Sequence, residues 1–439
     1  MANETETRVV SVESRTIQKL RTRIIPFIFI LYVIAFIDRI NIGFAALTMN
    51  RELAITSQQF GLLSGIFFIG YFFFEIPSNL LLHKIGARVW IARILITWGL
   101  VAALTGLVRS VHQLYVVRFL LGFAEAGYFP GIVLYLTYWF RQREQARVIA
   151  LFLTGLPVTN ILGAPISGLI LDHVHWLGIS SWRWLLILEG IPAVVAGLLT
   201  YLLLPSRPEE AGFLDMEETE WIRTELKREE QQKLEQRQYS VLQALTSSRV
   251  WLLTSIYFGL TLGINTFNFW APQLMQSAAS EYSNSAVGFL VMVPNLVGLA
   301  AMILVSRSSD HSMERRYHVA IPAITAGVAF VLLGTLHSPS FSVALLSLLA
   351  IGIYSTAGPF WALPNEFLTG FSAAAGIALI NSFGNLGSFV GIYAIGAISS
   401  RTGSIYRGLA LAAIPLLVSA TLVILLPRRA RSNLVTLGK

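Results

Sequence analysis

Four charged side chains interrupt long apolar stretches and are the residues best suited to chemistry. Asp38 and Arg39 follow one apolar run, and Arg118 and Glu125 lie seven positions apart in another. A charge at the centre of a bilayer costs about 2.5–3.5 kcal/mol, so charges retained there usually serve a function. Asp38 and Asn41 share a helical face while Arg39 points about 100° away, so one can face a helix and the other a cavity. We favour an anion anchor beside a titrating carboxylate over an ion-pair network that only pins helices.

The segment around Glu125 is rich in small residues, among them Gly122 and Gly127. Small residues let membrane helices approach closely, which would bury Glu125. Burial favours the protonated carboxyl, whereas a nearby arginine favours the ionised one. A carboxyl held between these effects can change its protonation state when the arginine changes partner. We therefore predict that Glu125 carries a proton, with a static pair to Arg118 as the alternative.

Three further polar residues in apolar runs have different expected roles. Tyr71 can donate a hydrogen bond to a substrate oxygen, and Glu75 lies one helical turn after it. Glu189 follows a segment of tryptophan and arginine at 182–184, a composition typical of the membrane interface. We expect structural roles for Glu75 and Glu189.

The second half of the chain offers amides and aromatic rings in place of charges. A substrate with one carboxylate and several hydroxyls, or with an aromatic ring, would fit between such a surface and the cationic first half. Each amide taken alone could equally form an interhelical hydrogen bond. The candidates are Asn265, Asn268, Trp270, Asn295, Phe360, Trp361, Asn381, Ser382 and Asn385.

The elements that position these residues are predicted to be membrane helices. Of 439 residues, 55% are hydrophobic and only 13% are charged, about half the charged fraction of soluble domains. The long apolar runs do not alternate as barrel strands do, so the predicted fold class is an all-α membrane protein. We expect twelve spans at about 24–48, 60–82, 88–109, 112–138, 146–170, 182–204, 247–275, 284–305, 317–336, 341–367, 373–398 and 406–426.

Most lysines and arginines of the short loops fall on one side of this arrangement, together with both termini. The positive-inside rule then predicts cytoplasmic termini, in a plasma membrane that we take to be a bacterial inner membrane. Two six-span units of nearly equal length surround a central polar linker, which suggests an internal repeat with its site near the midplane. The predicted divisions are a cytosolic N-terminus (1–23), two six-helix bundles (24–204 and 247–426), a cytosolic linker with an amphipathic helix (205–246) and a cytosolic tail (427–439).

Several other classes of protein do not fit the sequence. There is no cysteine and no cluster with metal-ligand spacing, nucleophile–base pattern or phosphate loop, so we expect neither an enzyme nor a cofactor. The net charge of +8 sits in loops between apolar runs, so it does not indicate nucleic-acid binding. The linker and tail are too short for a receptor's signalling domain. The expected partners are lipid, a small organic anion and protons, and the chain is expected to be a monomer.

These residues resemble the major facilitator superfamily over almost the whole chain, and more narrowly its anion:cation symporter family. The resemblance implies proton-coupled uptake of an organic anion by alternating access. It also implies that Asp38 and Glu125 titrate, that Arg118 bridges them, and that Arg39, Tyr71, Trp361 and Asn381 line the substrate site. The motifs that carry it are Asp38-Arg39-Ile40-Asn41-Ile42-Gly43, Tyr71-Phe72-Phe73-Phe74-Glu75-Ile76-Pro77-Ser78-Asn79, Arg118-Phe119-Leu120-Leu121-Gly122-Phe123-Ala124-Glu125-Ala126-Gly127 and Asn381-Ser382-Phe383-Gly384-Asn385-Leu386-Gly387.

One cytosolic loop departs from the superfamily pattern. His83 stands where the superfamily usually has the aspartate that helps latch the cytosolic gate, followed by Lys84 and Arg88. The corresponding loop of the second half keeps Asp310, with Arg315 after it. We therefore expect a weaker latch in the first half, with a pH-sensitive gate at His83 as a further hypothesis.

Two transport modes remain open from the sequence. Proton symport of an organic anion is the first, with a sugar acid, a tartrate-like diacid or an aromatic carboxylate as substrate. Exchange of an organic anion against phosphate is the alternative. The buried carboxylates favour symport, because a pure anion exchanger gains nothing from them.

Overall fold

The computed structural model describes residues 2–235, 246–335, 338–367 and 370–426, and within these ranges the chain is helical, with no strand. The predicted tail 427–439 and residues 236–245 of the predicted linker lie outside the described residues. The first half contains α1 (Ala2–Glu52), α2 (Ser57–Ile85), α3 (Ala87–Thr105), α4 (Val111–Glu125), α5 (Tyr128–Thr137), α6 (Gln142–Leu153), α7 (Gly155–His173), η1 (Trp176–Gly178) and α8 (Ser181–Leu203). Between the halves lie η2 (Pro208–Glu210) and α9 (Met216–Glu235). The second half contains α11 (Ser248–Ala278), α12 (Asn284–Ser312), α13 (Arg316–Leu333), α14 (Pro339–Ser355), α15 (Ala357–Phe367), α16 (Gly370–Thr402), α17 (Ile405–Leu411) and α18 (Ala413–Leu425).

These helices supply twelve segments that are long and apolar enough to cross a membrane, which confirms the predicted fold class. Four of the segments run across two helices each: α4 with α5, the end of α6 with α7, α14 with α15, and α17 with α18. The predicted span at 24–48 lies within a longer helix, since α1 continues without a break from Ala2 to Glu52.

The single helix expected over 112–138 is instead broken after Glu125. Gly127 has φ +87°, a left-handed conformation that glycine adopts without strain. A Cβ atom at Gly127 would lie 2.3 Å from Ser78 Oγ, so the break also needs the absence of a side chain. Glu125 therefore ends α4, beside an interruption in the helix.

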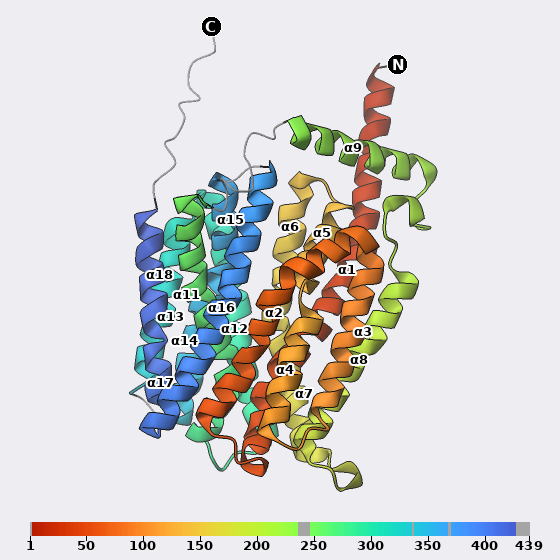
Figure 1. The fold of residues 1–439 in the computed structure, drawn as a ribbon. Helices are drawn as coiled ribbons and strands as arrows, with labels where there is room; N and C mark the ends of the chain where they lie inside the picture. The colour runs from red at the N-terminus through yellow and green to blue at the C-terminus, as the bar shows by residue number, and fades with distance from the viewer. Residues whose placement is uncertain (1, 236–245, 336–337, 368–369, 427–439) are drawn as a thin grey trace.

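The two halves stand side by side, with α9 lying across the end at which α1 begins (Figure 1). The last described helix, α18, also ends there, and we name this the α9 end. Ile222 of α9 is fully buried and Trp221 partly buried, as the predicted amphipathic pattern of the linker requires.

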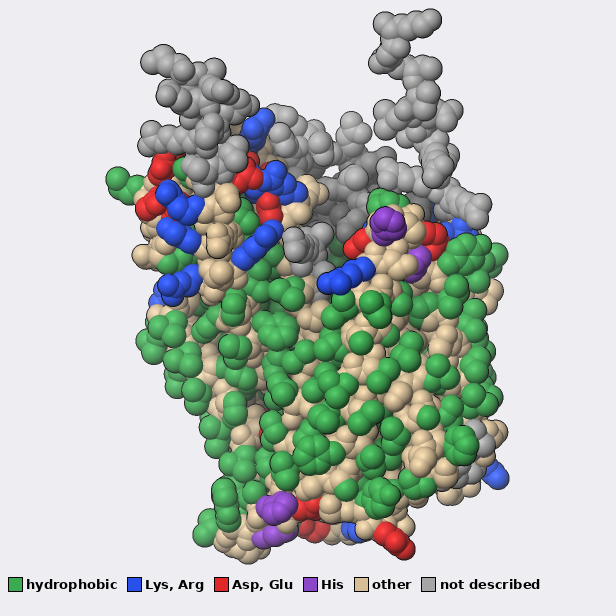
Figure 2. All heavy atoms as spheres, turned by 180° about the vertical axis from the view of Figure 1, so that it is seen from behind, with side chains coloured by type: hydrophobic (Ala, Val, Ile, Leu, Met, Phe, Trp, Pro, Cys, Tyr) green, Lys and Arg blue, Asp and Glu red, His purple; other side chains and the backbone are tan. Residues whose placement is uncertain are grey.

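The outer surface has the character of a membrane protein. Hydrophobic side chains cover the middle of the face seen in Figure 2, while Lys, Arg, Asp and Glu gather at the two ends. Large apolar side chains such as Phe73 and Leu202 are more than half exposed. Such a belt is stable in lipid, so the chain is a multi-pass membrane protein.

The halves contact each other chiefly through three pairs of helices: α2 with α16, α7 with α12, and α1 with α11. Hydrogen bonds between them cluster at the end opposite α9. The Asp172 carboxylate of α7 accepts from the backbone N–H groups of Asn284 and Ser285, at 3.1 and 2.7 Å, and so caps the start of α12. Nearby, Gln58 of α2 donates through its backbone N–H to Ser400 Oγ of α16 (2.7 Å).

Candidate functional site

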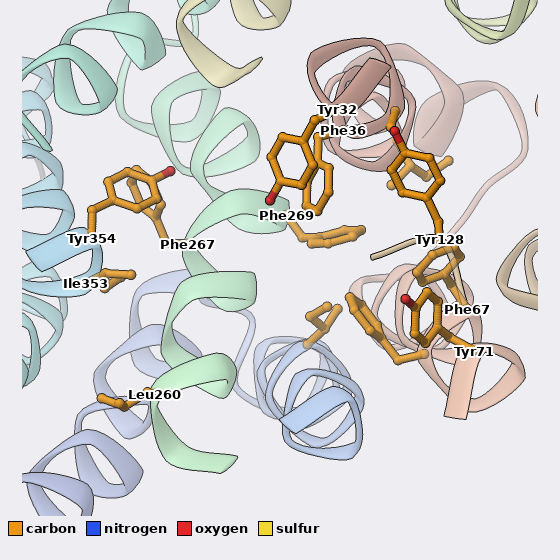
Figure 3. Close-up of a cluster of buried hydrophobic side chains, with 14 of the residues drawn as sticks. Tyr32, Phe36, Phe67, Tyr71, Tyr128, Leu260, Phe267, Phe269, Ile353 and Tyr354 are labelled. Atoms are coloured by element: carbon orange, nitrogen blue, oxygen red, sulfur yellow. The ribbon is translucent and has the colours of Figure 1, made fainter. Parts of the chain in front are cut away.

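A cavity of about 140 Å³ lies between the halves and is the natural candidate for a binding site. Figure 3 shows aromatic side chains around it from both halves, including Tyr32, Phe36 and Tyr71 from the first and Tyr354 from the second. Of the eleven residues that the sequence offered for the substrate surface, eight line it and three do not. Those that line it are Arg39, Tyr71, Asn265, Asn268, Phe360, Trp361, Asn381 and Asn385, and those that do not are Trp270, Asn295 and Ser382.

Arg39 is the positive charge on the cavity wall. Its guanidinium pairs with Glu125, and its side chain is 13% exposed against 1% for Glu125. Three aromatic rings surround the guanidinium, with centroids at 4.4 Å (Phe36), 5.2 Å (Phe67) and 5.6 Å (Tyr71). The rings hold the cation in place without neutralising it. Glu125 is therefore the group that neutralises Arg39 in this conformation.

Asp38 faces away from the cavity, into the first half. It accepts hydrogen bonds from Trp98 Nε1 of α3 (2.5 Å) and from Asn41 Nδ2 (3.0 Å). Asp38 and Arg39 therefore point in different directions, as predicted: the Asp38 side chain faces a neighbouring helix and the Arg39 side chain faces the cavity. Both positions follow from the helical rotation between consecutive residues.

The bridge expected from Arg118 is wrong for this conformation. Arg118 is fully buried over the ring of Phe67, 5.3 Å from its centroid, and forms an ion pair with neither Asp38 nor Glu125. Its Nε and Nη2 atoms have no hydrogen-bond partner. Glu125 pairs with Arg39 instead of Arg118, and α4 approaches α2 closely near this pair, since a Cβ atom at Gly122 would lie 2.0 Å from the Phe67 carbonyl oxygen.

The second half contributes neutral groups to the cavity. Asn265 uses its amide N–H groups on Ser388 Oγ (2.8 Å) and the Thr261 carbonyl (3.2 Å), which leaves its oxygen as the group that can accept from a ligand. Tyr257 packs edge-on against Trp361 with centroids 4.9 Å apart. This wall can therefore accept hydrogen bonds from ligand hydroxyl groups and pack against an apolar or aromatic part of the ligand.

Glu75 connects the halves, a role that the sequence did not reveal. Its carboxylate accepts from Asn381 Nδ2 (2.6 Å) and Ser382 Oγ (2.8 Å) of α16, and only 3% of the residue is exposed. The signal was a carboxylate one turn from Tyr71 in an apolar run, but sequence alone does not give the partner helix.

A second polar cluster between the halves was also missed. Tyr354 OH donates toward Asn295 Oδ1 (2.7 Å) and Asn268 Oδ1 (3.2 Å), and Asn160 of α7 donates to Asn268 Oδ1 (3.4 Å). Asn268 and Tyr354 line the cavity. Asn160 lacked any signal because one amide in an apolar helix is common.

The residues proposed for gating lie at the α9 end. Arg88 donates to the Tyr201 carbonyl (2.8 Å), Arg315 pairs with Asp310 (2.5 Å), and Lys84 is exposed. The side chain of His83 lies outside the described residues. Among described residues, no three His, Asp or Glu side chains converge on a possible metal site.

Comparison with known proteins agrees with this architecture. The family described as Major Facilitator Superfamily matches residues 28–392. A protein of Agrobacterium vitis named "Putative tartrate transporter" is 44% identical, covering 96% of each chain. A protein of Acinetobacter baumannii named "Quinolone resistance transporter" is 39% identical, covering 90% of this chain and 91% of its own.

A solved structure supports the fold independently of close sequence similarity. The inward-facing, occupied crystal structure of a bacterial homologue of the human lysosomal transporter Spinster superposes with a TM-score of 0.74. The superposition covers 92% of this chain and 96% of the homologue's chain, and the two sequences are 15% identical.

Proposed function

The chain belongs to the major facilitator superfamily, and on that premise we propose that it is a symporter that moves a small organic anion together with protons. The observation that carries the proposal is the Arg39–Glu125 ion pair on the wall of a cavity whose remaining polar groups are neutral. The similarity to a protein named as a tartrate transporter supports a hydroxylated acid as the substrate class.

Coupling follows from competition for Arg39. A substrate carboxylate and the Glu125 carboxylate both need the same guanidinium, and neither has another cation at hand on the cavity wall. A proton on Glu125 releases Arg39 to the anion, so proton binding favours anion binding and, by linkage, anion binding favours proton binding. The two ligands then enter and leave together.

The other walls would select the neutral part of the substrate. The Asn265 oxygen can accept from a hydroxyl, and Asn381 and Asn385 offer further amides on the same cavity wall. Asn381 of the second half donates a hydrogen bond to Glu75 of the first half. The substrate would therefore contact a residue whose position depends on a bond between the two halves. Asp38 and Arg118 complete the proposed proton-coupling set, since Arg118 and Arg39 are both near enough to act on Asp38 electrostatically.

For orientation, we propose that the α9 end is cytoplasmic, that the membrane is a bacterial inner membrane, and that the protein acts as a monomer. The bonds that join the halves at the opposite end, such as Asp172 to α12, support a conformation closed to the outside. The predicted bundles 24–204 and 247–426 would move against each other to open that end.

The test begins with a thermal-shift screen of the purified protein against tartrates, hexonates, hexuronates and aromatic acids. The hits are then assayed in proteoliposomes for uptake and for proton movement. Symport predicts that substrate entry alkalinises the outside, and that Glu125→Gln abolishes accumulation against a gradient while counterflow persists. Accumulation by Glu125→Gln, or phosphate-stimulated exchange with no response to a pH gradient, contradicts the proposal.

The similarity to a quinolone resistance transporter favours a second candidate, export of an amphipathic drug. The aromatic rings of Tyr32, Phe36, Tyr257 and Trp361 would suit an aromatic ligand. Including quinolones in the same screen separates the two, because a drug exporter binds them and lowers their concentration in cells.

A further inference from the structure

Glu189 is a buried carboxyl that the proposed transport cycle does not use. It lies in α8, only 5% of it is exposed, and its Oε1 accepts from Ser167 Oγ of α7 at 2.8 Å. Within the part of the chain that the structure describes, its Oε2 is buried without a hydrogen-bond partner and no lysine or arginine forms an ion pair with it. A carboxylate in this position would be a buried, unneutralised charge, which proteins avoid by holding a proton.

The Asn41 amide lies close enough to this carboxyl to interact with it. Asn41 Nδ2 donates to Asp38, while Asn41 Oδ1 is buried and also lacks a partner. Two buried acceptors, Glu189 Oε2 and Asn41 Oδ1, are thus each missing a donor. A proton on Glu189 Oε2 would be a donor that Asn41 Oδ1 could accept, and this bond would link Ser167, Glu189, Asn41 and Asp38 in one chain.

The surroundings of Glu189 bring no other titratable group into this chain. Of the three helices packed on α8, α1 brings Asp38, and α7 brings Asp172 and His173 only at its outer end, where Asp172 is bonded to α12. The charged residues of α3, Arg88 and Arg93, belong to its cytosolic end, where Arg88 donates to Tyr201. On α8 itself, Arg183 pairs with Glu52 at the outer rim.

The depth of these residues gives the chain a direction. Counted from the outer ends of their helices at 1.5 Å per residue, Glu189 lies about 12 Å deep, Asn41 about 16 Å and Asp38 about 21 Å. A proton on Glu189 is therefore closer to the outside than one on Asp38.

We propose that Glu189 is a further proton-binding site, which holds a proton on the outer side of Asp38 and passes it to Asp38. In the step, the O–H bond at Glu189 Oε2 breaks and a new one forms on an Asp38 oxygen. The Asn41 amide turns over, so that its N–H donates to the new Glu189 carboxylate and its oxygen accepts from protonated Asp38. Charge and protons balance, and the same three side chains stay hydrogen-bonded in both states.

The first test detects the proton directly and needs no substrate. Infrared spectroscopy of the purified protein in lipid should show the C=O band of a protonated carboxyl that is absent in Glu189→Gln. Glu52→Gln, which removes a carboxyl at the outer rim, should retain the band. Ser167→Ala should shift its frequency, which identifies the band even if Glu189→Gln does not fold. A band unchanged in both Glu189→Gln and Ser167→Ala, or no such band in the wild type, overturns the proposal.

The second test asks whether the proton is passed on, and this part rests on the proposed symport. In proteoliposomes with tartrate as the probe, Glu189→Gln should slow pH-driven uptake at least tenfold. Counterflow, which needs no proton release, should stay within twofold of the wild type. Glutamine keeps both hydrogen bonds, so a purely structural Glu189 predicts wild-type rates in both assays, and that result overturns the relay. If wild-type tartrate uptake ignores a pH gradient, the proposed function fails, while the infrared result still decides whether Glu189 binds a proton.

Discussion

The first half presents Arg39 to the cavity with Glu125 behind it, whereas the second half presents Asn265, Asn385 and Trp361. Charge is therefore concentrated on one side of the site and neutral hydrogen-bonding groups on the other. In the proposed transport cycle, energy coupling and substrate selection are therefore carried by different halves of the protein. Variants of the first half should alter whether transport is driven by protons, and variants of the second half should alter what is transported.

The largest effect on transport is expected from substitution of Arg39. Arg39→Ala removes the one positive charge that the described residues bring to the cavity wall, and it leaves Glu125 buried without its partner. Loss of a charge-assisted contact with the substrate should lower uptake at least about 100-fold. Arg51→Ala, which removes an exposed arginine at the outer end of α1, serves as the control and should transport normally. Uptake retained by Arg39→Ala would remove Arg39 from the site.

The contact between the halves should be next in size. Asp172→Ala removes the carboxylate that accepts three hydrogen bonds from Asn284 and Ser285 of α12. Weakening this closure should favour the conformation open at that end by about tenfold. The chain has no cysteine, so a single cysteine replacing Thr356 on the cavity wall can be labelled without background. Faster labelling from outside is expected, and an unchanged rate would mean that Asp172 does not help to close this end.

Selection by the second half predicts a smaller effect that depends on the substrate. Asn265→Ala removes an acceptor for a substrate hydroxyl and should raise the KM for a hydroxylated acid about 3–10-fold. The KM for a matched acid without hydroxyls, succinate against tartrate for example, should change little. The proton:substrate ratio should stay the same for both, and a changed ratio would contradict the separation of roles.

The smallest effect is expected outside the membrane, at Glu218 of α9. Burial alone would raise the pKa of Glu218, but hydrogen bonds from Lys19, the Asp215 N–H and Arg15 outweigh it and hold the pKa below its usual value. A carboxyl with a lowered folded-state pKa stabilises the protein above its unfolded pKa of about 4.3, and this stability is lost as pH falls through the folded value.

Glu218→Gln should therefore cost about 1 kcal/mol near neutral pH, since its two cationic partners are partly exposed. The difference in Tm between wild type and variant should shrink as the pH falls below about 4. Transport should be unaffected at neutral pH. A constant Tm difference across this range would show that the ion pairs contribute no stability.

The fold and the lining of the cavity could be predicted because hydropathy and intramembrane polarity are local signals. Arg39 is unusual in an apolar helix, and amides such as Asn265 and Asn381 become informative where several of them recur in one half of the chain that lacks intramembrane charges. Partners could not be predicted in the same way. Arg118 and Arg39 are chemically equivalent candidates for Glu125, and the choice of Arg39 depends on how α1, α2 and α4 pack, which the sequence does not give.

Glu189 illustrates the same limit. Its position near the outer rim predicted a structural role, because tryptophan and arginine precede it. The sequence could not show that α8 places the Glu189 carboxyl beside Asn41. Nor could it show that the Nδ2 atom of Asn41 donates a hydrogen bond to Asp38. Long-range pairing of this kind depends on how α1, α7 and α8 pack.

Competition between substrate and Glu125 for Arg39 is tested most directly by calorimetric titration of the purified protein with the best acid from the screen. Repeating the titration in buffers of different ionisation enthalpy counts the protons taken up on binding. Affinity should rise as pH falls, with net proton uptake in the wild type, and both effects should be lost in Glu125→Gln. Binding that is independent of pH, with no proton uptake by the wild type, would contradict the coupling.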